Sequence, residues 1–419
     1  MTAEIILIIL ITIIIVFVIV SLLWYAFRFE VTNFKIVNNT IYVKPITGSS
    51  NHAGNAIEDN LSNLERNEHP LKILHLSDFH LRKDFKGKKL ENFIKTLSFE
   101  TYDFIFITGD MVEKNELQDK LIETLKTLKA GYGIYAVFGA HDYYNKKPVE
   151  FIKNMFKKRE SYSRKNDVEG LRKKLEFAEI KVLQNESIIL KDIGGYNEID
   201  IIGVDDPIIN KMDLEKSLSG IFQDISDIKI TNISPENLIL RDFNMTDISK
   251  DSKFKGSVGD ENKQHGLKKG KSISEAEKIL EDKIPENQKN RYLINTEQIK
   301  KTQEYKETFI LSVTKYHELR SSKMLKIALV HTPDSYALVN LAVNGIDIVF
   351  AGHTHGGQIR IPKIGALISG CSLKTKYAAG LFYFKNFVLQ VSKGLGEGRF
   401  SRFRIHCDPE AIITTIKEI

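Results

Sequence analysis

A repeated unit constrains the fold of this 419-residue chain more than any other feature. In each unit an apolar run of strand length ends at a polar residue, and a loop and an amphipathic stretch follow. Continuous apolar runs are typical of strands that are buried on both faces, and strands that alternate with helices indicate a layered α/β fold. The runs are KILHLSDFH, YDFIFITGD, GIYAVFGAHD, IKVLQNESIIL, EIDIIGVDDP, MLKIALVHTPD and GIDIVFAGHTHGG.

The first 30 residues have a different character. From Ile5 to Phe27 the chain carries no charged residue. A helix of that length spans a hydrocarbon core of roughly 30 Å, and Trp24 and Tyr25 stand where an interfacial aromatic belt would lie. A cleaved signal peptide fits less well, because the stretch lacks a basic start, is too long and precedes no A-x-A site. We therefore expect one transmembrane anchor over residues 1–30 and a single-pass protein of the cell membrane.

The charges around this stretch suggest an orientation. Arg28, Lys35 and Lys44 follow the apolar run, and no basic residue precedes it. The positive-inside tendency then favours a body on the cytoplasmic side. The net charge of the whole chain is only +6, and no basic-aromatic stripe is present, so we expect no nucleic-acid partner.

The rest of the chain divides into three further parts. Residues 31–69 begin with VTNFKIVNNTIYVKPI, which predicts a β-hairpin turning at the two asparagines, and continue as a polar linker. Residues 70–207 and 323–419 hold the repeated units and form the predicted main domain. Between them, residues 208–322 are too polar to bury enough surface to offset their ordering entropy. We expect a largely disordered insertion, either a tolerated surface excursion or a lid or membrane-proximal arm.

Side chains that bind metals gather where the predicted strands end. Ligands of layered α/β proteins bind beyond the carboxyl ends of the strands, and five of the eleven histidines lie there. His75 lies inside its run, so we expect it in the core or supporting a ligand from behind. Imidazoles and carboxylates without a thiolate suit Mn, Fe or Zn better than copper or an iron–sulfur cluster. The candidates are Asp78, His80, Asp110, His141, Asp142, His331, His353 and His355.

The ordered set resembles that of the calcineurin-like metallophosphoesterases. That family shares Asp-x-His, Gly-Asp, Gly-Asn-His-Asp/Glu, a lone His and Gly-His-x-His. Here these motifs stand as DFH (78–80), GD (109–110), GAHD (139–142), His331 in VHTPD and GHTH (352–355). The longer AGHTHGGQIRIP resembles the membrane-associated bacterial branch of the family. The resemblance implies an α/β fold of two packed mixed β-sheets flanked by helices.

The resemblance also implies a site for two divalent metal ions. Such a pair clamps the phosphoryl oxygens and lowers the pKa of a shared water, whose hydroxide attacks phosphorus. His141 would stabilise the phosphoryl charge or protonate the leaving oxygen, and Asp142 would orient the His141 ring. The implied ligands are Asp78, His80, Asp110 and His355 for the first ion, with Asp110 bridging, and His331 and His353 for the second.

Ala140 departs from the family pattern, which has asparagine at this position. The asparagine gives its side-chain oxygen to the second ion, and a methyl group cannot. Since catalytic metal sites keep open positions that water fills, we expect the second ion to bind more weakly while the enzyme still turns over. Glu113 stands where the family often has aspartate, and we expect little consequence.

These observations predict a membrane-anchored, metal-dependent phosphoesterase. Its substrate would be a phosphomonoester, a phosphodiester or a pyrophosphate. Because an anchor holds the site near a bilayer, the expected partner is a phosphorylated small molecule or a lipid-linked compound such as UDP-2,3-diacylglucosamine, which related enzymes cleave. The alternative, which Ala140 leaves open, is a catalytically degenerate, membrane-tethered metal-binding or scaffold protein.

Overall fold

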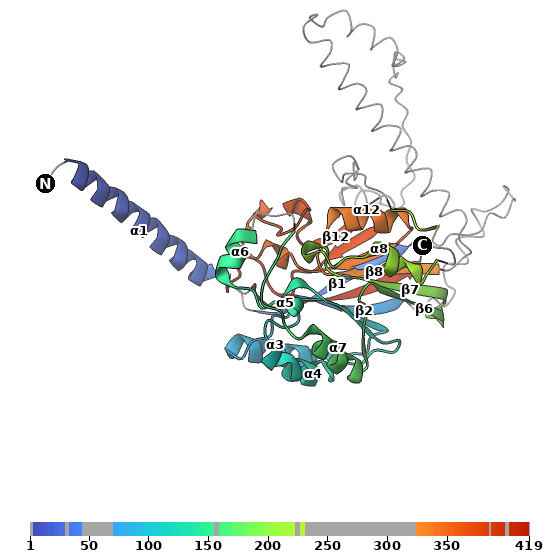
Figure 1. Cartoon of the computed structure of the whole chain (residues 1–419). Coiled ribbons are helices and arrows are strands. Elements are labelled where there is room, and N and C mark those ends of the chain that lie inside the picture. Colours follow the sequence, from blue (N-terminus) through green and yellow to red (C-terminus); the bar gives the residue numbers. More distant parts are fainter. Residues whose placement is uncertain are drawn as a thin grey trace, which may run out of the picture.

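Two six-stranded sheets pack face to face and carry helices on their outer faces (Figure 1). The computed structural model describes residues 3–29, 33–43, 70–154, 159–222, 227–230, 324–384, 387–398 and 402–418. Each sheet contains both parallel and antiparallel pairs. The expected α/β architecture of two packed mixed sheets is therefore confirmed.

The first sheet has the strand order β1–β14–β2–β3–β4–β5. Strands β2 to β5 run parallel, and β14 is antiparallel to β2. The bounds are β1 (Lys35–Val43), β14 (Glu410–Glu418), β2 (Leu71–Leu76), β3 (Phe104–Thr108), β4 (Ile134–Val137) and β5 (Ile180–Val182).

The second sheet has the order β12–β13–β9–β8–β7–β6. Its four central strands, β13, β9, β8 and β7, run parallel. A separate two-stranded ribbon joins β10 (Arg360–Ile361) to β11 (Gly365–Ala366). The bounds are β12 (Gly380–Tyr383), β13 (Val388–Val391), β9 (Ile348–Ala351), β8 (Met324–Val330), β7 (Tyr196–Val204) and β6 (Glu186–Ile193).

Successive residues of the buried strands face different apolar cores. In β2, Ile73 contacts the core between the sheets, whereas Leu74 contacts the helices on the outer face. Both side chains are fully buried, which explains why such strands read as continuous apolar runs. The first sheet is covered by α3 (Phe85–Leu97), α4 (Gln118–Leu125) and α7 (Val168–Phe177), and the second by α8 (Leu214–Ser219) and α12 (Ser335–Val343).

The hairpin expected within residues 31–46 is wrong. The chain forms one strand, β1, which pairs in parallel with β14. The two asparagines do not turn the chain, because Asn39 takes an inward position and its Nδ2 donates to Gln390 Oε1 at 3.0 Å. Along β1 the side chains continue to alternate between the two faces of the sheet as far as Ile41, which is fully buried.

Two other boundaries differ from the expectation. The run IKVLQNESIIL is divided between the sheets, since Ile180–Val182 is β5 of the first and Glu186–Ile193 is β6 of the second. The predicted insertion starts too early, because Leu214 and Leu218 of α8 are buried in the core of the second sheet. The remaining insertion from 231 onward and the linker over 44–69 lie outside the described residues.

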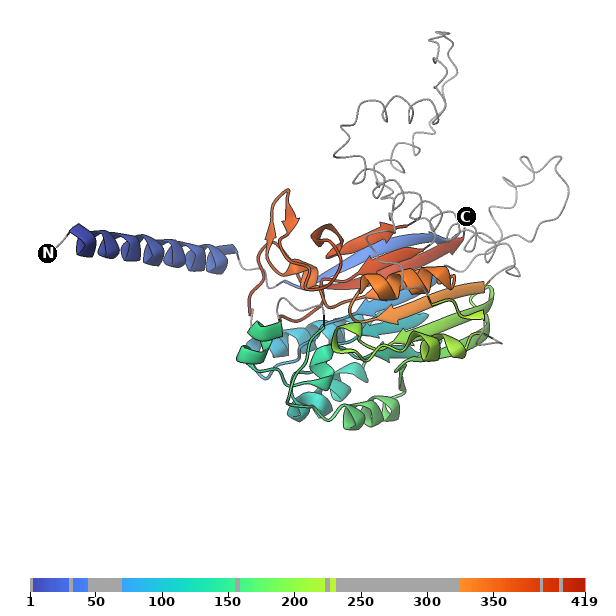
Figure 2. The ribbon, with the colours of Figure 1, turned by 45° about the horizontal axis from the view of Figure 1, so that its top comes forward.

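A separate helix, α1 (Ala3–Phe29), extends away from the sheets in both views (Figures 1 and 2). Within the part of the chain that the structure describes, no helix combines the length and the apolar character needed to cross a bilayer. The transmembrane anchor expected over residues 1–30 is therefore not confirmed.

Candidate metal centre

Neighbouring strands of the first sheet bring two predicted site residues to one edge. Strands β3 and β4 run parallel, with Thr108 paired to Val137. Asp110 and His141 follow these residues closely, so they leave the sheet side by side. The backbone N–H of His141, at the start of the short helix α5 (Ala140–Tyr143), donates to Asp110 Oδ1 at 2.8 Å.

The second sheet brings further predicted residues to the same place. Val330 of β8 is in register with Ala351 of β9, and His331 and His353 come just after them. His331 Nδ1 donates to the carbonyl oxygen of Thr108 at 2.7 Å. The strand ends of the two sheets therefore lie against each other, and loops from both form one site.

The backbone at these strand ends is locally strained. A non-glycine residue in the left-handed region costs roughly 1–3 kcal/mol, and such residues cluster at functional sites. Most of the predicted ligands adopt this conformation. Their φ angles are 50° at Asp78, 39° at His80, 50° at Asp110, 68° at His353 and 48° at His355.

Asp78, His80 and His355 form a first group of donors, whose ligand atoms lie within 4.8 Å of one another. His80 Nε2 is 3.1 Å from His355 Nε2, which is 3.5 Å from Asp78 Oδ1. Ligand atoms about 2.1 Å from one ion, at tetrahedral angles, stand about 3.4 Å apart. The spacing and the chemistry of this group therefore fit a divalent metal ion.

Asp110 and His331 form a second group next to the first, with their ligand atoms within 4.8 Å of Asp78, and His353 adjoins this group through His331. Asp110 Oδ2 is 3.2 Å from His331 Nε2 and 3.5 Å from His80 Nε2. His331 Nε2 is in turn 3.4 Å from His353 Nδ1. One oxygen of Asp110 thus faces both groups, as a bridging ligand requires. The six residues predicted to be ligands all converge on this place.

In three of the histidines, a contact made by one ring nitrogen orients the other ring nitrogen toward the donor groups. His331 uses Nδ1 for a backbone carbonyl, as described above, and His353 Nε2 donates to Gly370 O at 3.0 Å. His80 Nδ1 faces Glu113, with 3.3 Å between Nδ1 and Oε1. These contacts leave Nε2 of His80 and His331 and Nδ1 of His353 as electron-pair donors, as in metal-binding histidines. Glu113 thus contacts a predicted ligand, contrary to the small role expected for it.

Burial and neighbouring charges shift the pKa values of Asp110 and His331 in opposite directions. Burial raises the pKa of Asp110, but the attraction of His331 outweighs it and holds the pKa well below its usual range. Burial lowers the pKa of His331, but Asp110 outweighs it and raises this pKa well above the usual value. These two directions favour a carboxylate–imidazolium pair, so a metal ion that binds here has to displace the proton of His331.

His141 lies beside both groups with an unused ring nitrogen. Its ring centroid is 4.7 Å from that of His80, and its Nδ1 is buried without a hydrogen-bond partner. Burial, followed by the positive charge of Lys146, lowers the pKa of His141 well below its usual value. A neutral imidazole with an unused nitrogen can form one hydrogen bond with a bound molecule.

Asp142 does not orient the His141 ring, so that prediction is wrong. Its Oδ1 accepts from Met111 N at 2.8 Å and from Val112 N at 3.1 Å, and its Oδ2 accepts from Gly139 N at 2.9 Å. Both oxygens therefore bind backbone N–H groups at the ends of β3 and β4. The carboxylate holds these two strand ends at a fixed separation.

Two small residues, Gly139 and Ala140, precede His141, and their surroundings differ. A Cβ at Gly139 would clash with Asp110 Oδ1 and lie 2.6 Å from His331 Cδ2, so only glycine leaves room for these two side chains. Ala140 is fully buried and belongs to the apolar core under α5. Its methyl group adds no donor to the site.

His75 occupies the core, as predicted. Its side chain is fully buried in β2, and Nε2 lies 2.9 Å from Thr108 Oγ1. Burial lowers the pKa of His75 to about 3. This histidine is therefore neutral and structural.

Sequence reasoning missed two buried charged residues near the predicted ligands. Arg404 Nη2 lies 3.3 Å from His355 Nδ1 and donates to Lys393 O at 2.8 Å. Asp206 is fully buried and interacts electrostatically with His331. No spacing marks Arg404, whereas the signal for Asp206 is the carboxylate pair in GVDDP, directly after an apolar run.

A comparison with protein families agrees with this geometry. The model described as "Calcineurin-like phosphoesterase" matches residues 71–240, which include Asp78, His80, Asp110 and His141. Over these 170 of its 419 residues the chain is similar to the calcineurin-like phosphoesterase family. The other three histidines of this calcineurin-like site lie beyond the matched stretch, yet the fold brings them to the same place.

Several curated proteins are similar to this calcineurin-like chain. The "Uncharacterized metallophosphoesterase YkoQ" of Bacillus subtilis is 31% identical over 155 residues, which cover 36% of this chain and 49% of YkoQ. The "Phosphodiesterase YaeI" of Escherichia coli is 33% identical over 85 residues, covering 20% and 30%. The "Transmembrane protein with metallophosphoesterase domain" of Bos taurus is 27% identical over 162 residues, covering 36% and 32%. The chain thus spans about half or less of the length of these relatives.

Proposed function

We propose that this chain hydrolyses a phosphoester with the help of two divalent metal ions. The observation that carries the proposal is the position of Asp110 Oδ2, which faces both His80 and His331. When bound, two such ions neutralise phosphoryl oxygens and activate water as the nucleophile. Imidazole and carboxylate donors favour Mn, Fe or Zn in these sites.

The chain's own residues prepare the site for a phosphoryl group. His141, buried and neutral, can donate a hydrogen bond to a phosphoryl oxygen or, once protonated, give a proton to the leaving oxygen. Lys146, which pairs with Glu160 at 3.1 Å, adds positive charge near His141. Asp142 fixes the strand ends that present Asp110 and His141. His141 is thus assigned the contact with the substrate, and Lys146 and Asp142 support it from behind.

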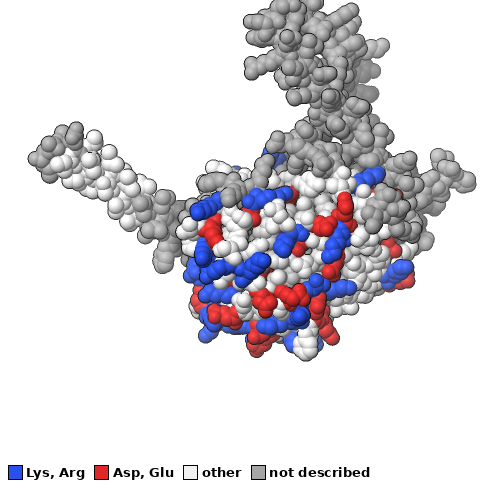
Figure 3. Space-filling view, in the orientation of Figure 1, with Lys and Arg blue, Asp and Glu red and all other residues white. Residues whose placement is uncertain are grey.

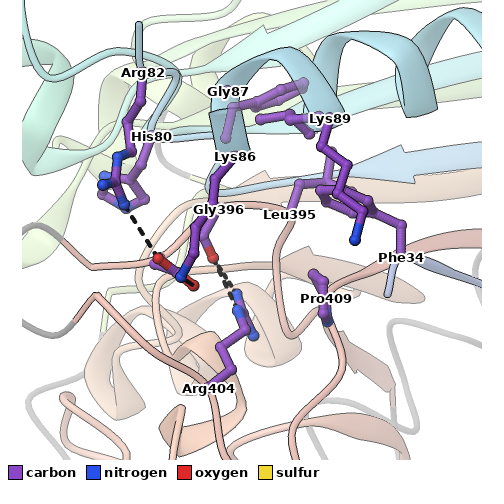
Figure 4. A pocket seen from close by; sticks show the side chains of 13 residues that line it. Phe34, His80, Arg82, Lys86, Gly87, Lys89, Leu395, Gly396, Arg404 and Pro409 are labelled. Atoms are coloured by element: carbon purple, nitrogen blue, oxygen red, sulfur yellow. Dashed lines mark hydrogen bonds and ion pairs between the residues drawn. The ribbon is translucent and has the colours of Figure 1, made fainter. Parts of the chain in front are cut away.

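A pocket next to His80 supports an amphipathic substrate (Figure 4). One part of its lining is apolar, including Phe34 and Leu395, and another part is charged, with Lys89 and the ion pair of Lys86 and Glu397 (2.7 Å). Such a lining suits a phosphorylated group joined to an apolar one. The proposal includes a lipid-linked phosphate compound, of which UDP-2,3-diacylglucosamine is one example, beside phosphorylated small molecules. Because the pocket measures only about 40 Å³, the apolar part of such a substrate would extend beyond it.

The same proposal places the enzyme at the cell membrane, with its body on the cytoplasmic side. Large apolar side chains of α1 are exposed, among them Leu7 (57%), Ile14 (61%) and Phe17 (70%), and exposed apolar surface of this extent favours a lipid environment. Sedimentation of the full chain with liposomes tests this part. Binding that is lost when Leu7, Ile14 and Phe17 are changed to Ser supports it, and unchanged binding contradicts it.

Hydrolysis is tested with the full chain in detergent and added Mn²⁺. We expect release of nitrophenol from bis(p-nitrophenyl) phosphate or from p-nitrophenyl phosphate, and its loss in the His141→Ala variant. His406→Asn is the matched control, because His406 is exposed and lies outside the donor groups. Metal binding without turnover on either compound, or on a nucleotide-sugar lipid, contradicts the proposal.

Ala140 favours one alternative, a non-catalytic membrane-tethered metal-binding or scaffold protein. It predicts that the chain binds metal and is inactive, and that Ala140→Asn creates activity. On the face in Figure 3, basic side chains are interspersed with acidic and uncharged ones rather than joined in one stripe. A nucleic-acid substrate is therefore not proposed.

A further inference from the structure

The second donor group lacks the oxygen that the family's asparagine supplies. Ala140 stands in its place, is fully buried and packs in the apolar core. The remaining donors are Asp110, His331 and His353. An ion at this position is left with fewer protein donors, unless another side chain contributes.

The fold brings one further carboxylate to this edge of the sheet. Val204, the last residue of β7, is in register with Val330, the last residue of β8. Asp206 comes two residues after the end of β7 and His331 one residue after the end of β8, so both leave parallel neighbouring strands at the same edge of the sheet. Asp206 is fully buried.

Only one of the two oxygens of the Asp206 carboxylate accepts a hydrogen bond from the protein. Its Oδ1 accepts from Ile208 N at 3.1 Å, whereas its Oδ2 is buried without a hydrogen-bond partner. Thr332 Oγ1 interacts with the carboxylate but also lacks a hydrogen bond of normal geometry. A buried carboxylate oxygen without a partner is costly in a protein that binds nothing there.

Asp206 interacts electrostatically with all three residues of the second group. Asp206 attracts His331 and His353 and repels Asp110, as expected of a charge beside all three. Among the described residues it is not in a group with ligand atoms within 4.8 Å of one another. His353 is outside these groups as well, so both side chains would have to move closer to Asp110 and His331 to complete a site around a bound ion.

We propose that Asp206 supplies the oxygen donor of the second metal ion that Ala140 cannot. This inference rests on the two-ion site of the proposed function. A carboxylate also adds a negative charge, which the family's neutral asparagine does not. The second ion should therefore bind firmly, in contrast to the weak second site expected from Ala140 alone.

The test is Mn²⁺ binding by the full chain, followed by the EPR signal of the free ion. Wild type should bind two ions, and Asp206→Ala should keep the first while the Kd of the second rises about 10–100-fold. Asp213→Asn is the matched control, because it removes a nearby carboxylate charge at the exposed start of α8, where Asp213 Oδ1 accepts from Lys216 N, and leaves Asp206 in place. Adding Ala140→Asn to Asp206→Ala should restore the second ion, since it returns the family's donor.

The outcomes separate the inference from the proposed function. Two ions bound with unchanged affinity by Asp206→Ala overturn the inference and leave the two-ion site standing. A single ion bound by wild type overturns both. Should Asp206→Ala fail to fold, Asp206→Ser keeps a cap for Ile208 N but is too short to reach the ion. We expect the same loss from it, and unchanged binding would again overturn the inference.

Discussion

Asp110 Oδ2 lies 3.2 Å from His331 Nε2, although the two residues come from different sheets. The same oxygen faces His80 on the other side, at 3.5 Å from Nε2. Each sheet therefore contributes part of a site that neither could build alone. The contact also explains why Asp110 stays ionised while it is buried, since the positive charge of His331 offsets the cost of burial.

His141→Ala should lower kcat by roughly 10²–10⁴-fold, because it removes the group assigned to the phosphoryl or leaving oxygen. The six predicted metal ligands are untouched by this change. Mn²⁺ stoichiometry should therefore remain at the wild-type value while hydrolysis is lost. Metal analysis and steady-state kinetics on one preparation check this. Activity within a few-fold of wild type would remove His141 from the mechanism.

Asp142→Asn should destabilise the protein by about 2–4 kcal/mol, because an amide cannot accept all three backbone hydrogen bonds and points N–H groups at another donor. The loss should be visible in the free energy of unfolding in urea, measured with metal removed. Asp167→Asn is a suitable control, since Asp167 accepts from Gly170 N at the exposed start of α7. Equal stability of wild type and Asp142→Asn would show that Asp142 does not hold the strand ends.

Metal affinity should increase with pH above about 6. The pKa of His331 is raised in the metal-free protein, so its proton stabilises the fold below the unfolded-state pKa, and this contribution is lost as pH rises through the raised value. A metal ion competes with that proton. Affinity should then rise up to about tenfold per pH unit while His331 is protonated.

Mn²⁺ titrations between pH 6 and 9 check the slope, and His331→Gln should flatten it. Calorimetry in two buffers of different ionisation enthalpy should report a released proton. An affinity that is constant over this range would contradict the assigned protonation of His331.

Gly139→Ala should disturb the second donor group, because the added Cβ would lie 2.6 Å from the His331 ring. Relieving such a contact typically costs about 1–3 kcal/mol. We expect a lower melting temperature and loss of one bound ion. Gly131→Ala should be nearly neutral, since its Cβ would meet only Tyr102 O, at 3.9 Å. Retention of both ions by Gly139→Ala would contradict the placement of His331.

Much of the fold could be predicted because buried strands and amphipathic helices produce clear patterns of apolar residues in the sequence. The runs that end at Asp110, His331 and His353 became β3, β8 and β9. The asparagines of β1 were misleading, since Asn is a common turn residue and only the distant Gln390 shows that Asn39 points inward. Such a long-range partner leaves no local signal.

The sequence predicts the site residues that come directly after a strand. It does not predict the roles that depend on which groups a side chain hydrogen-bonds. Six ligand candidates converge, because parallel strands end at one edge. The role of Asp142 could not be read from the sequence, since its neighbour His141 suggested a ring contact, whereas the structure gives both oxygens to backbone N–H groups. Arg404 and Asp206 reach the site from loops that carry no metal-binding spacing.

The central claim is that Asp110 joins two metal ions in one centre. The most direct measurement is the EPR spectrum of the full chain loaded with two equivalents of Mn²⁺. Ions about 3.5–4 Å apart, as in two-metal sites, and sharing a carboxylate should give the broad multiline spectrum of an exchange-coupled pair. Asp110→Asn should abolish it. A spectrum of isolated six-line Mn²⁺ from wild type at full loading would contradict the shared centre.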